Sequence, residues 1–392
     1  MSKKIFLLLV AIFINACSSN SHDSNTSTSQ DCESTIDAKN IILFIGDGMG
    51  DNHRKAAQWL KVGQNGSLAM DNMTTAGFSR TSSANSAITD SAAAATALAT
   101  GAKTKNGVIG LDENLNELTT ILEEAQSQGK AVGLVTTTQM SHATPAAFAA
   151  HVESRGMMTE IAVQMVSAGV DVLLGGGEDE FLPTFEIGCY PESGEQPDGR
   201  NLINEAMSAG YTYVCDASSF YAVDPASTTY LLGLFADEGM SRPFSPSLAE
   251  MTQKAIDILS PNPSGFFLMV EGGQIDWASH SNDAYNALND TVDFDEAVDI
   301  AKAYAKNSCE TLIIVTADHE TGGMTTSLSQ TWHPDEDGPF YMPGGTPFYV
   351  NWASVSHTAS EVFTTAQGPS SELLTVEFEN TFIYDLMKSA QN

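Results

Sequence analysis

Apolar residues occur along the chain in short, nearly continuous runs separated by longer amphipathic stretches. Five runs have the length and β-branched content of buried strands: Ile41–Ile45, Ala131–Thr136, Val170–Leu174, Phe266–Val270 and Leu312–Thr316. Helices are predicted between them, over Asp90–Thr100, Thr119–Gln128, Met157–Ala168, Ser247–Leu259 and Ala284–Ala305. Buried strands that alternate with helices are typical of a mostly parallel sheet with helices on both faces. We therefore predict an α/β fold, with residues 37–392 forming one domain.

Two segments interrupt this alternation. Residues 178–200 are rich in Gly, Pro and Glu, and residues 329–352 are rich in Gly, Pro and aromatic residues. Such compositions are typical of loops and turns, so we interpret both segments as excursions from the sheet. The second is expected to form a small accessory or interface element.

The N-terminal segment differs from the rest of the chain. Two lysines precede the apolar run Ile5–Ile14, which is too short for a stable membrane anchor, so residues 1–16 are interpreted as a signal peptide. Cys17 follows a small residue, as in bacterial lipoprotein signals, although Asn15 is unusual there and leaves plain secretory cleavage open. Residues 17–36, rich in Ser, Asn and Thr, are expected to be a flexible tether. We expect an exported protein, periplasmic or anchored to the outer membrane through lipidated Cys17, and secreted if it is not lipidated.

The charge of the chain limits its partners. The 392 residues include 49 acidic and 17 basic side chains, which gives a formal net charge of −32. Such a surface repels nucleic-acid backbones, so no nucleic-acid partner is expected. Small anionic substrates stay open, because bound metal cations can reverse the sign of the charge within one pocket.

The cysteines are consistent with export. If Cys17 carries lipid, Cys32, Cys189, Cys215 and Cys309 remain, and an oxidising compartment can join them in two disulfides. Four cysteines allow three pairings. Cys189 and Cys215 flank one polar segment and are the favoured pair, while Cys32 and Cys309 each precede a predicted strand and could meet at one sheet edge. The alternative is four free, buried thiols.

Acidic, imidazole or hydroxyl side chains follow four of the predicted strands, in the segments 47–50, 141–145, 271–276 and 317–320. In an open parallel sheet the carboxyl ends of the strands lie along one edge, where ligands bind. A single Asp after a strand is usually a turn or cap residue. Its repetition at several strand ends predicts that these segments converge on one site.

Several of these residues are candidate metal ligands. Asp276 and His280 are four residues apart, which places them on one face of a helix, although a surface pair has the same spacing. Asp318 and His319 end a buried strand and are stronger candidates, and His357 lies in a loop-like stretch. Such donors suit Zn²⁺ where nitrogen is present and Mg²⁺ where all ligands are oxygen. No Cys occurs in the cluster, which argues against a structural zinc.

Ser91 is placed at the start of an Ala-rich helix that Gly101 would end. Thr89 or Asp90 can cap the first turn. The positive end of a helix, with its free N–H groups, is suited to a phosphate or another oxyanion, so the Ser91 hydroxyl is a candidate nucleophile. The alternative is that Ser91 serves only in the cap.

Arg155 is a candidate phosphate ligand. A guanidinium can grip phosphate through two parallel hydrogen bonds, which a lysine cannot do. The alternative is a surface ion pair with Glu153 or another acid.

Seven motifs, in collinear order from about residue 37 to the C-terminus, make the chain resemble the metal-dependent alkaline phosphatases. They are Asp-Gly-Met-Gly at 47–50, Asp-Ser-Ala at 90–92, Ala-Thr-Pro-Ala-Ala at 143–147, His-Val-Glu-Ser-Arg at 151–155, Glu-Gly-x-x-Ile-Asp-x-x-x-His at 271–280, Thr-Ala-Asp-His-Glu at 316–320 and His-Thr at 357–358. The resemblance implies that residues 37–392 are a catalytic domain that hydrolyses phosphate monoesters to an alcohol and inorganic phosphate through a phosphoserine intermediate.

The resemblance also implies roles for individual residues, with Ser91 as the nucleophile and Arg155 as the phosphate clamp. Two zinc ions and one magnesium ion per chain are implied. Their ligands would be Asp276, His280 and His357 for one zinc, Asp47, Asp318 and His319 for the other, and Asp47, Thr144 and Glu271 for magnesium.

The chain departs from one branch of the family at two positions near the metals. His142 stands where some members have Asp, and Trp277 stands where some have Lys, although other members carry His and Trp there. The accessory, crown-like region is expected to be reduced because the chain is shorter than many relatives. Since that region helps dimer contact in the family, a homodimer stays open.

Two other functions compete with this interpretation. A phosphodiesterase or sulfatase-like member of the same superfamily would keep the metal ligands but change the surroundings of the nucleophile. The sequence contains no Cys-x-Pro-x-Arg or Ser-x-Pro-x-Arg, which a sulfatase would need. A non-catalytic, metal-stabilised surface lipoprotein would be expected to lack Ser91 or Arg155, and both are present.

Overall fold

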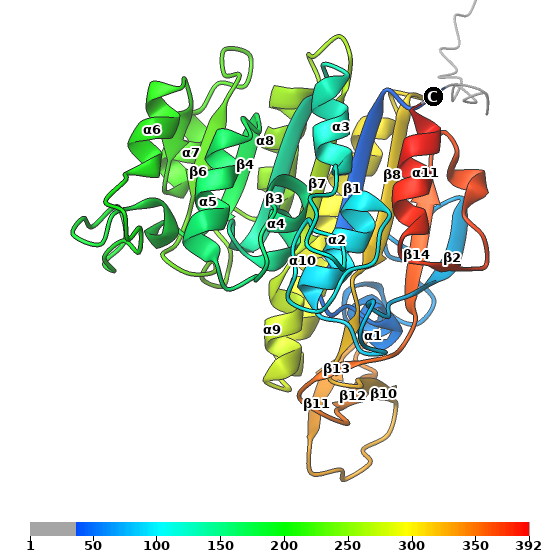
Figure 1. Ribbon diagram of the computed structural model, residues 1–392. Helices are drawn as coiled ribbons and strands as arrows, with labels where there is room; N and C mark the ends of the chain where they lie inside the picture. Colours follow the sequence, from blue (N-terminus) through cyan, green and yellow to red (C-terminus); the bar gives the residue numbers. More distant parts are fainter. Residues whose placement is uncertain (1–36, 392) are drawn as a thin grey trace, which may run out of the picture. The chain divides into compact units, whose positions relative to one another are not determined.

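The computed structural model describes residues 37–391, and within them ten strands form one large sheet (Figure 1). Seven neighbouring strands are parallel to one another: β8 (Thr311–Ala317), β1 (Asn40–Gly46), β7 (Phe266–Gly272), β3 (Ala131–Gln139), β4 (Val172–Gly176), β6 (Leu231–Leu234) and β5 (Thr212–Val214). Three strands extend the sheet beyond β8: β14 (Val362–Gln367), β2 (Thr75–Arg80) and β15 (Glu377–Glu379). Of these three, β14 is antiparallel to both β8 and β2, whereas β15 is parallel to β2. The sheet is therefore mostly parallel, as predicted.

Helices cover both faces of the sheet, as the sequence pattern predicts. Six pack on one face: α2 (Ser91–Thr100), α3 (Ile121–Ser127), α4 (Ala143–Ala149), α5 (Met158–Ser167), α6 (Leu202–Ser208) and α11 (Phe382–Ala390). Five pack on the other: α1 (Asp51–Val62), α7 (Ala217–Ala222), α8 (Leu248–Leu259), α9 (Gln274–His280) and α10 (Ala284–Ala305). The five predicted helices correspond to α2, α3, α5, α8 and α10.

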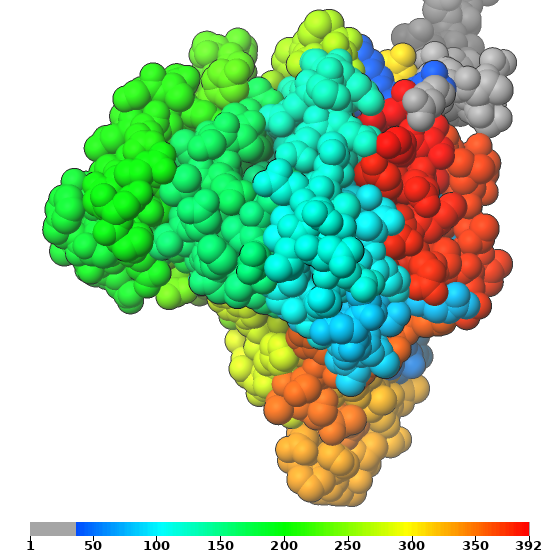
Figure 2. Space-filling view, viewed as in Figure 1, coloured from blue at the N-terminus to red at the C-terminus, as the bar shows by residue number. Residues whose placement is uncertain are grey.

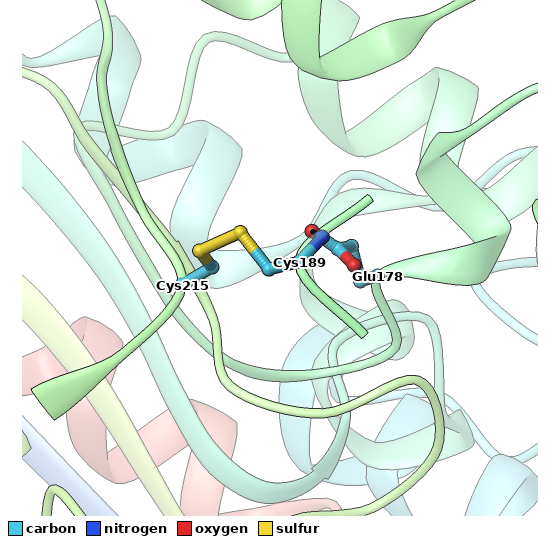
Figure 3. A group of neighbouring side chains, drawn as sticks. All are labelled: Glu178, Cys189 and Cys215. Atoms are coloured by element: carbon cyan, nitrogen blue, oxygen red, sulfur yellow. Dashed lines mark hydrogen bonds between the residues drawn. A yellow bond between two sulfur atoms is a disulfide. The ribbon is translucent and has the colours of Figure 1, made fainter. Parts of the chain in front are cut away.

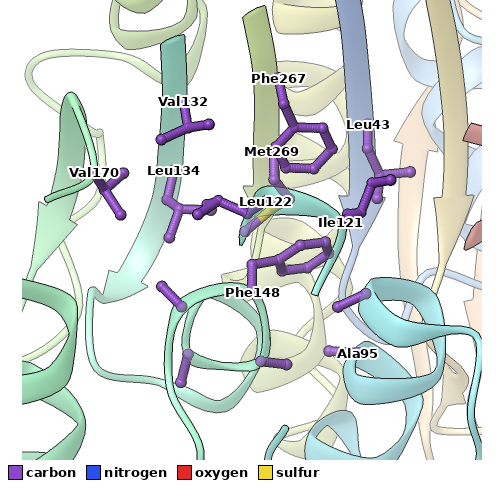
Figure 4. Packing of buried hydrophobic residues seen from close by; sticks show 14 of the residues in the cluster. Leu43, Ala95, Ile121, Leu122, Val132, Leu134, Phe148, Val170, Phe267 and Met269 are labelled. Atoms are coloured by element: carbon purple, nitrogen blue, oxygen red, sulfur yellow. The ribbon is translucent and has the colours of Figure 1, made fainter. Parts of the chain in front are cut away.

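The central strand β1 contributes side chains to the hydrophobic cores on both faces of the sheet. Successive side chains of a strand point to opposite faces, so Leu43 packs in one core cluster and Phe44 in the other. Figure 4 shows the first cluster, in which Phe148 of α4 lies against Phe267 and Met269 of β7. The two clusters fix the sheet between its helices and hold its carboxyl edge in place.

The predicted excursion at 329–352 is a small antiparallel sheet. It consists of β10 (Thr325–Ser327), β12 (Pro347–Asn351) and β11 (Glu336–Tyr341). A third core cluster, with Trp59, Phe348 and Trp352, joins this sheet to α1. In Figure 1 the sheet, in orange, projects beyond the ends of the parallel strands that carry the site residues described below, and Figure 2 shows the same orange residues standing out from the rest of the surface.

The predicted excursion at 178–200 consists of turns and a short 3-10 helix, Asp179–Phe181. Cys189 of this excursion forms a disulfide with Cys215, and its backbone N–H donates a 2.9 Å hydrogen bond to Glu178 (Figure 3). The favoured pairing is confirmed, and the alternative of four free thiols is wrong. The pairing of Cys32 with Cys309, like the signal peptide, Cys17 and the tether, involves residues outside the described part of the chain.

Within residues 37–391, none of the helices combines the length and the apolar character that crossing a bilayer requires.

Candidate active site

The predicted convergence of strand ends on one edge of the sheet is confirmed. In the parallel register, Ile45 of β1 pairs with Glu271 of β7 and with Thr316 of β8. Asp47 and Asp318 therefore follow at one level, two residues beyond the level of Glu271. All three carboxylates are almost completely buried, between 0% and 2% exposed, so they form a charged cluster inside the protein rather than on its surface.

Ser91 is the first residue of α2, and its side chain faces this cluster. Asp90 is the N-cap, and its carboxylate accepts a 3.1 Å hydrogen bond from the backbone N–H of Ala93. Gly101 ends the helix in the left-handed region at φ 71°, as expected for a C-cap. The Ser91 Oγ lies 3.3 Å from His319 Nε2, so the hydroxyl adjoins the candidate metal ligands as well as the helix N-terminus.

One group of candidate ligands consists of Asp47, Asp318 and His319, each of which places a donor atom within 4.8 Å of the others. His319 Nε2 lies 3.2 Å from an Asp318 oxygen and 3.6 Å from an Asp47 oxygen. The opposite ring nitrogen, Nδ1, lies 3.3 Å from the Thr321 hydroxyl. The predicted grouping of these three residues, beside Ser91, is present in the structure.

A second group surrounds Asp276, whose donor atoms lie within 4.8 Å of those of His319 and His357, and the predicted ligand His280 adjoins Asp276 and His357. Asp276 and His280 lie on α9 (Gln274–His280), which follows β7, and their side chains are 3.2 Å apart. His357 belongs to β13 (His357–Thr358), which pairs with β9 (Glu320–Thr321), and its Nε2 lies 3.1 Å from His280 Nε2. His357 is therefore brought into the site from a segment that has an unremarkable sequence.

Backbone carbonyls orient the histidines of the second group. His280 Nδ1 lies 2.7 Å from the Val355 carbonyl, and His357 Nδ1 lies 2.9 Å from the Thr89 carbonyl. A carbonyl only accepts, so each Nδ1 carries a proton and each Nε2 faces Asp276. Histidine ligands of metals are held in this way in proteins.

The third group contains Asp47, Glu271 and His142, with donor atoms within 4.8 Å of one another. Thr144 is fully buried in the first turn of α4, two residues after His142. Asp47 and Glu271, which the resemblance assigns to magnesium, therefore lie together in the structure. In addition, one ring nitrogen of His142 lies within 4.8 Å of a carboxylate oxygen of each of these two acids.

Many polar atoms of the site are buried without a hydrogen-bond partner, which is rare in folded proteins. They are both carboxylate oxygens of Asp47, one each of Glu271 and Asp318, the Thr144 hydroxyl and His142 Nδ1. Their chemistry, with oxygen predominating and histidine nitrogen close by, matches the ligands that Mg²⁺ and Zn²⁺ take in proteins. The donor set therefore fits metal ions.

The electrostatics of the site also favour a cation. Burial, followed by the charges of Asp318 and Asp276, raises the pKa of Asp47 well above its usual value. Burial raises the pKa of Glu271 to about 7, despite a hydrogen bond from the Thr136 hydroxyl. These acids resist ionisation because they repel one another in a low-dielectric site, and a bound cation would relieve that repulsion.

Asp276 and His280 form an ion pair. Burial opposes ionisation of Asp276, but the hydrogen bond from His280 and the nearby histidines hold its pKa below the usual value. The same hydrogen bond raises the pKa of His280 to about 9. The pair therefore bears its own compensating charge where no metal is bound, unlike Asp47 and Glu271.

The Arg155 side chain lies beside the site and is partly exposed to solvent. Its guanidinium lies 3.2 Å from an Asp90 oxygen and 3.0 Å from His142 Nε2. Arg155 thus pairs with the N-cap of the helix that Ser91 begins, and its acidic partner is Asp90 rather than the Glu153 considered from the sequence. Burial and the charge of Arg155 lower the pKa of His142 to about 3, so this imidazole is neutral.

Trp277 and His142 are in direct contact. The two rings meet edge to face, with centroids 5.8 Å apart. The Trp277 ring also packs on Gly239, where a Cβ atom would lie 2.5 Å from the indole. The two positions at which the chain departs from one branch of the family therefore form one structural unit.

The sequence analysis missed two buried residues that support the site. Thr321 donates a 2.5 Å hydrogen bond to Asp276 and adjoins His319, so it links the first two groups. His53 accepts a 3.2 Å bond from the backbone N–H of Gly50 and contacts the Ser279 hydroxyl at 2.9 Å. It thereby connects the turn after Asp47 to α9. A lone Thr or a His inside a helix gives no signal of such a role in the sequence.

The fold and the site together define an α/β protein with several candidate metal-binding groups beside a serine at a helix N-terminus. A family model described as alkaline phosphatase matches residues 38–337. Alkaline phosphatase 4 of Bacillus subtilis (strain 168) is 40% identical over 333 residues, covering 80% of this chain and 68% of that protein. Alkaline phosphatase 3 of the same organism is 41% identical over 302 residues, covering 73% of this chain and 62% of that protein.

Solved structures show the same similarity. Alkaline phosphatase from the Antarctic bacterium TAB5 matches with a TM-score of 0.78 and 32% identity, over 91% of this chain and 98% of that one. A histidine-to-aspartate variant of that enzyme has been solved with Mg bound in its M3 site. The chain belongs to the alkaline phosphatase family, whose members are metal-dependent phosphomonoester hydrolases.

Proposed function

We propose that this protein hydrolyses phosphate monoesters to an alcohol and inorganic phosphate, with Ser91 carrying the phosphoryl group between two half-reactions. The observation that carries the proposal is the position of the Ser91 hydroxyl, 3.3 Å from His319 and at the N-terminus of α2. A phosphate placed there would meet the free N–H groups of the helix and the Arg155 guanidinium.

Three metal ions would be held by the three groups of the site. We assign one zinc to Asp276, His280 and His357, and the other to Asp47, Asp318 and His319. Magnesium is assigned to Asp47, Glu271 and Thr144, whose unpartnered oxygens are the ligands that it prefers. When bound, such ions neutralise the attacking and departing oxygens of an in-line displacement and lower the proton affinity of a nearby hydroxyl.

The residues of the chain supply the rest of the reaction. In the first half-reaction, Ser91 Oγ loses its proton to solvent and bonds to phosphorus, while the bond from phosphorus to the alcohol oxygen breaks and that oxygen takes up a proton. In the second, a water oxygen loses a proton and attacks the phosphoserine, the Ser91 Oγ–P bond breaks, Ser91 Oγ is reprotonated and inorganic phosphate is released. Arg155 binds the equatorial oxygens, where most transition-state charge lies, and its contact with Asp90 fixes the guanidinium.

Substrate comparison tests this function against the two competing ones. Purified, metal-loaded protein is assayed on a chromogenic phosphate monoester, the matching diester and the matching sulfate ester. We expect the monoester to have by far the highest kcat/KM. Its terminal phosphate would present three oxygens and up to two negative charges to Arg155 and the metals, whereas a diester or a sulfate ester carries one negative charge. A preference for the diester or the sulfate would contradict the proposal, and so would no turnover of any ester.

We propose that His142 and Trp277 weaken the third metal site and phosphate binding. His142 is neutral and brings no negative charge to Asp47 and Glu271, so His142→Asp should reduce the dependence of activity on added magnesium. The magnesium-bound histidine-to-aspartate variant of the TAB5 enzyme supports this expectation. The measurement is activity against magnesium concentration, and an unchanged half-saturation value would refute the assignment.

Trp277 offers one N–H donor and no cation to bound phosphate. Trp277→Lys is therefore expected to tighten product inhibition by inorganic phosphate and to lower the maximal rate, because product release often limits turnover. Trp277→Phe, which keeps an aromatic ring against Gly239, is the matched control. If the inhibition constant of Trp277→Lys equals that of the native protein, this side chain does not face the substrate.

We further propose that the protein is exported and anchored to a bacterial envelope through Cys17. The Cys189–Cys215 disulfide supports an oxidising compartment. Mass spectrometry of the native protein is expected to show an N-terminus at lipidated Cys17, with more than one acyl chain because a single chain anchors weakly. An intact Met1 would refute export, whereas an unmodified Cys17 in membrane-free protein would refute only the anchor.

A further inference from the structure

Thr321 lies where the segments that carry the two proposed zinc groups meet. It is fully buried and belongs to the two-residue strand β9, in which its cross-strand partner on β13 is His357. Its backbone N–H donates a 3.0 Å hydrogen bond to the carbonyl of Gly48, in the turn that follows Asp47. The backbone of Thr321 therefore joins a ligand segment of one proposed zinc ion to a ligand segment of the other.

The hydroxyl group of Thr321 contacts one ligand from each zinc group. Thr321 Oγ1 lies 2.5 Å from Asp276 Oδ1 and 3.3 Å from His319 Nδ1. A Cβ atom on Gly48 would lie 2.8 Å from both Thr321 Oγ1 and Asp276 Oδ1, so the backbone of this turn covers the contact closely. The N–H of the same glycine donates a 3.0 Å hydrogen bond to Asp318. Ligands of both groups are thus packed around one hydroxyl group.

The chemistry of these side chains determines the direction of both hydrogen bonds. A carboxylate that binds a metal ion is ionised, so Asp276 only accepts and the single hydroxyl proton of Thr321 is donated to it. The hydroxyl oxygen then presents a lone pair to His319, whose Nδ1 carries the proton. The lone pair of the neutral imidazole is therefore on Nε2, which lies 3.2 Å from Asp318 and 3.3 Å from Ser91 Oγ.

The shared oxygen atom makes each group sensitive to the other. A cation that fixes Asp276 keeps the hydroxyl proton on that side and the hydroxyl lone pair directed at His319. Hydrogen bonds in such a chain polarise and strengthen one another in a buried site. Coupling between two binding sites is reciprocal, so a cation held by His319 would favour binding at Asp276 by the same factor.

We propose that Thr321 is a positioning residue that couples the two proposed zinc sites, so that zinc bound at one site raises the affinity of the other. This inference rests on the proposed function, in which both groups bind zinc, and adds the residue that makes them load together. Thr321 itself would bind neither metal nor phosphate, because its hydroxyl group is directed at Asp276 and His319.

Zinc binding by the whole protein tests the proposal without the use of activity. Native protein and variants are stripped of metal, supplied with magnesium and equilibrated in buffers that set the free zinc concentration. Thr321→Val replaces the hydroxyl by a methyl group of similar size, so it should weaken binding of both zinc ions by about 10- to 100-fold. The two ions should also load less cooperatively. Thr321→Ser keeps the hydroxyl group and should restore the native binding curve.

Melting temperatures distinguish positioning from packing. Thr252→Val is the matched control, because Thr252 is equally buried and its hydroxyl donates to the Leu248 carbonyl within α8. A loss of packing alone would lower the melting temperatures of metal-free and zinc-loaded protein alike, as is expected for this control. Thr321→Val should instead reduce the rise that zinc produces. Thr321→Ala, which also lacks the hydroxyl, takes the same measurements if Thr321→Val does not fold.

The proposal is overturned if Thr321→Val binds both zinc ions as tightly as the native protein, or if Thr321→Ser binds them as weakly as Thr321→Val. Weaker binding of only one zinc ion would also overturn it, because Thr321 would then support a single group. A native protein that loads two zinc ions cooperatively through Thr321 but hydrolyses no phosphate monoester would contradict the proposed function and leave the coupling in place. Fewer than two zinc ions in the native protein would overturn both.

Discussion

Ser91→Ala is expected to lower kcat on a phosphate monoester by about a thousandfold or more, with inorganic phosphate still bound. The variant loses the only atom that would form the covalent bond to phosphorus. It retains Arg155, the N–H groups of α2 and the metal ligands, which would bind the phosphate oxygens. Because Ser91 is 1% exposed and its helix is capped by Asp90, the loss of one hydroxyl leaves the fold intact.

The measurement for this variant combines steady-state kinetics, a phosphate inhibition constant and metal content. Ser208→Ala is the matched control, because Ser208 is exposed on α6 and bonds only to the Asn204 carbonyl. Near-native turnover in Ser91→Ala would remove Ser91 from the mechanism. A loss of turnover accompanied by a loss of metal would instead mean that the serine acts mainly as a structural neighbour of His319.

Removal of the metals by a chelator is expected to abolish activity and to lower the melting temperature by roughly 10 °C. Buried carboxylates from β1, β7 and β8 repel one another when no cation is present, as the raised pKa values of Asp47 and Glu271 indicate. Metals that bridge segments distant in sequence would remove this repulsion and tie the sheet edge together. Calorimetry before and after chelation, followed by readdition of zinc and magnesium, gives the measurement.

The effect of the chelator depends on pH, with a sign that the pKa values determine. Metal binding requires deprotonated ligands, so it is weaker below the folded-state pKa of Glu271, about 7, and that of His280, about 9. The difference in melting temperature between metal-loaded and metal-free protein should therefore be larger at pH 8 than at pH 6. A chelator effect that is equal at both pH values, or fewer than two transition-metal ions per active chain, would contradict the proposed centre.

The sequence predicts the centre of the sheet better than its edges. The five predicted strands are buried on both faces, so each is a nearly continuous apolar run. Strand β2, with the sequence Thr-Ala-Gly-Phe-Ser-Arg, mixes polar and small residues, and its residues range from the buried Ser79 to the exposed Arg80. Strand β2 forms because it pairs with β14 and β15. Such pairing depends on tertiary contacts, so the local sequence pattern does not reveal it.

The sequence predicts those residues of the candidate site that lie at or directly after the carboxyl ends of parallel strands. Asp47, Glu271 and Asp318 could be associated because parallel strands deliver them to one edge. His357 depended on the family resemblance, since its place in the site comes from the pairing of β13 with β9. The bond of Arg155 to His142 arises from tertiary packing and has no counterpart in residue spacing.

The central claim is that Ser91 carries a phosphoryl group during turnover, and trapping that intermediate tests it most directly. Metal-loaded protein is mixed with a phosphate monoester, quenched in acid and digested for mass spectrometry. The account predicts one phosphoryl group per chain, located on Ser91 and absent from Ser91→Ala. Phosphorylation at another residue would contradict it, as would rapid turnover of the native protein with no trapped phosphoserine on the peptide that contains Ser91.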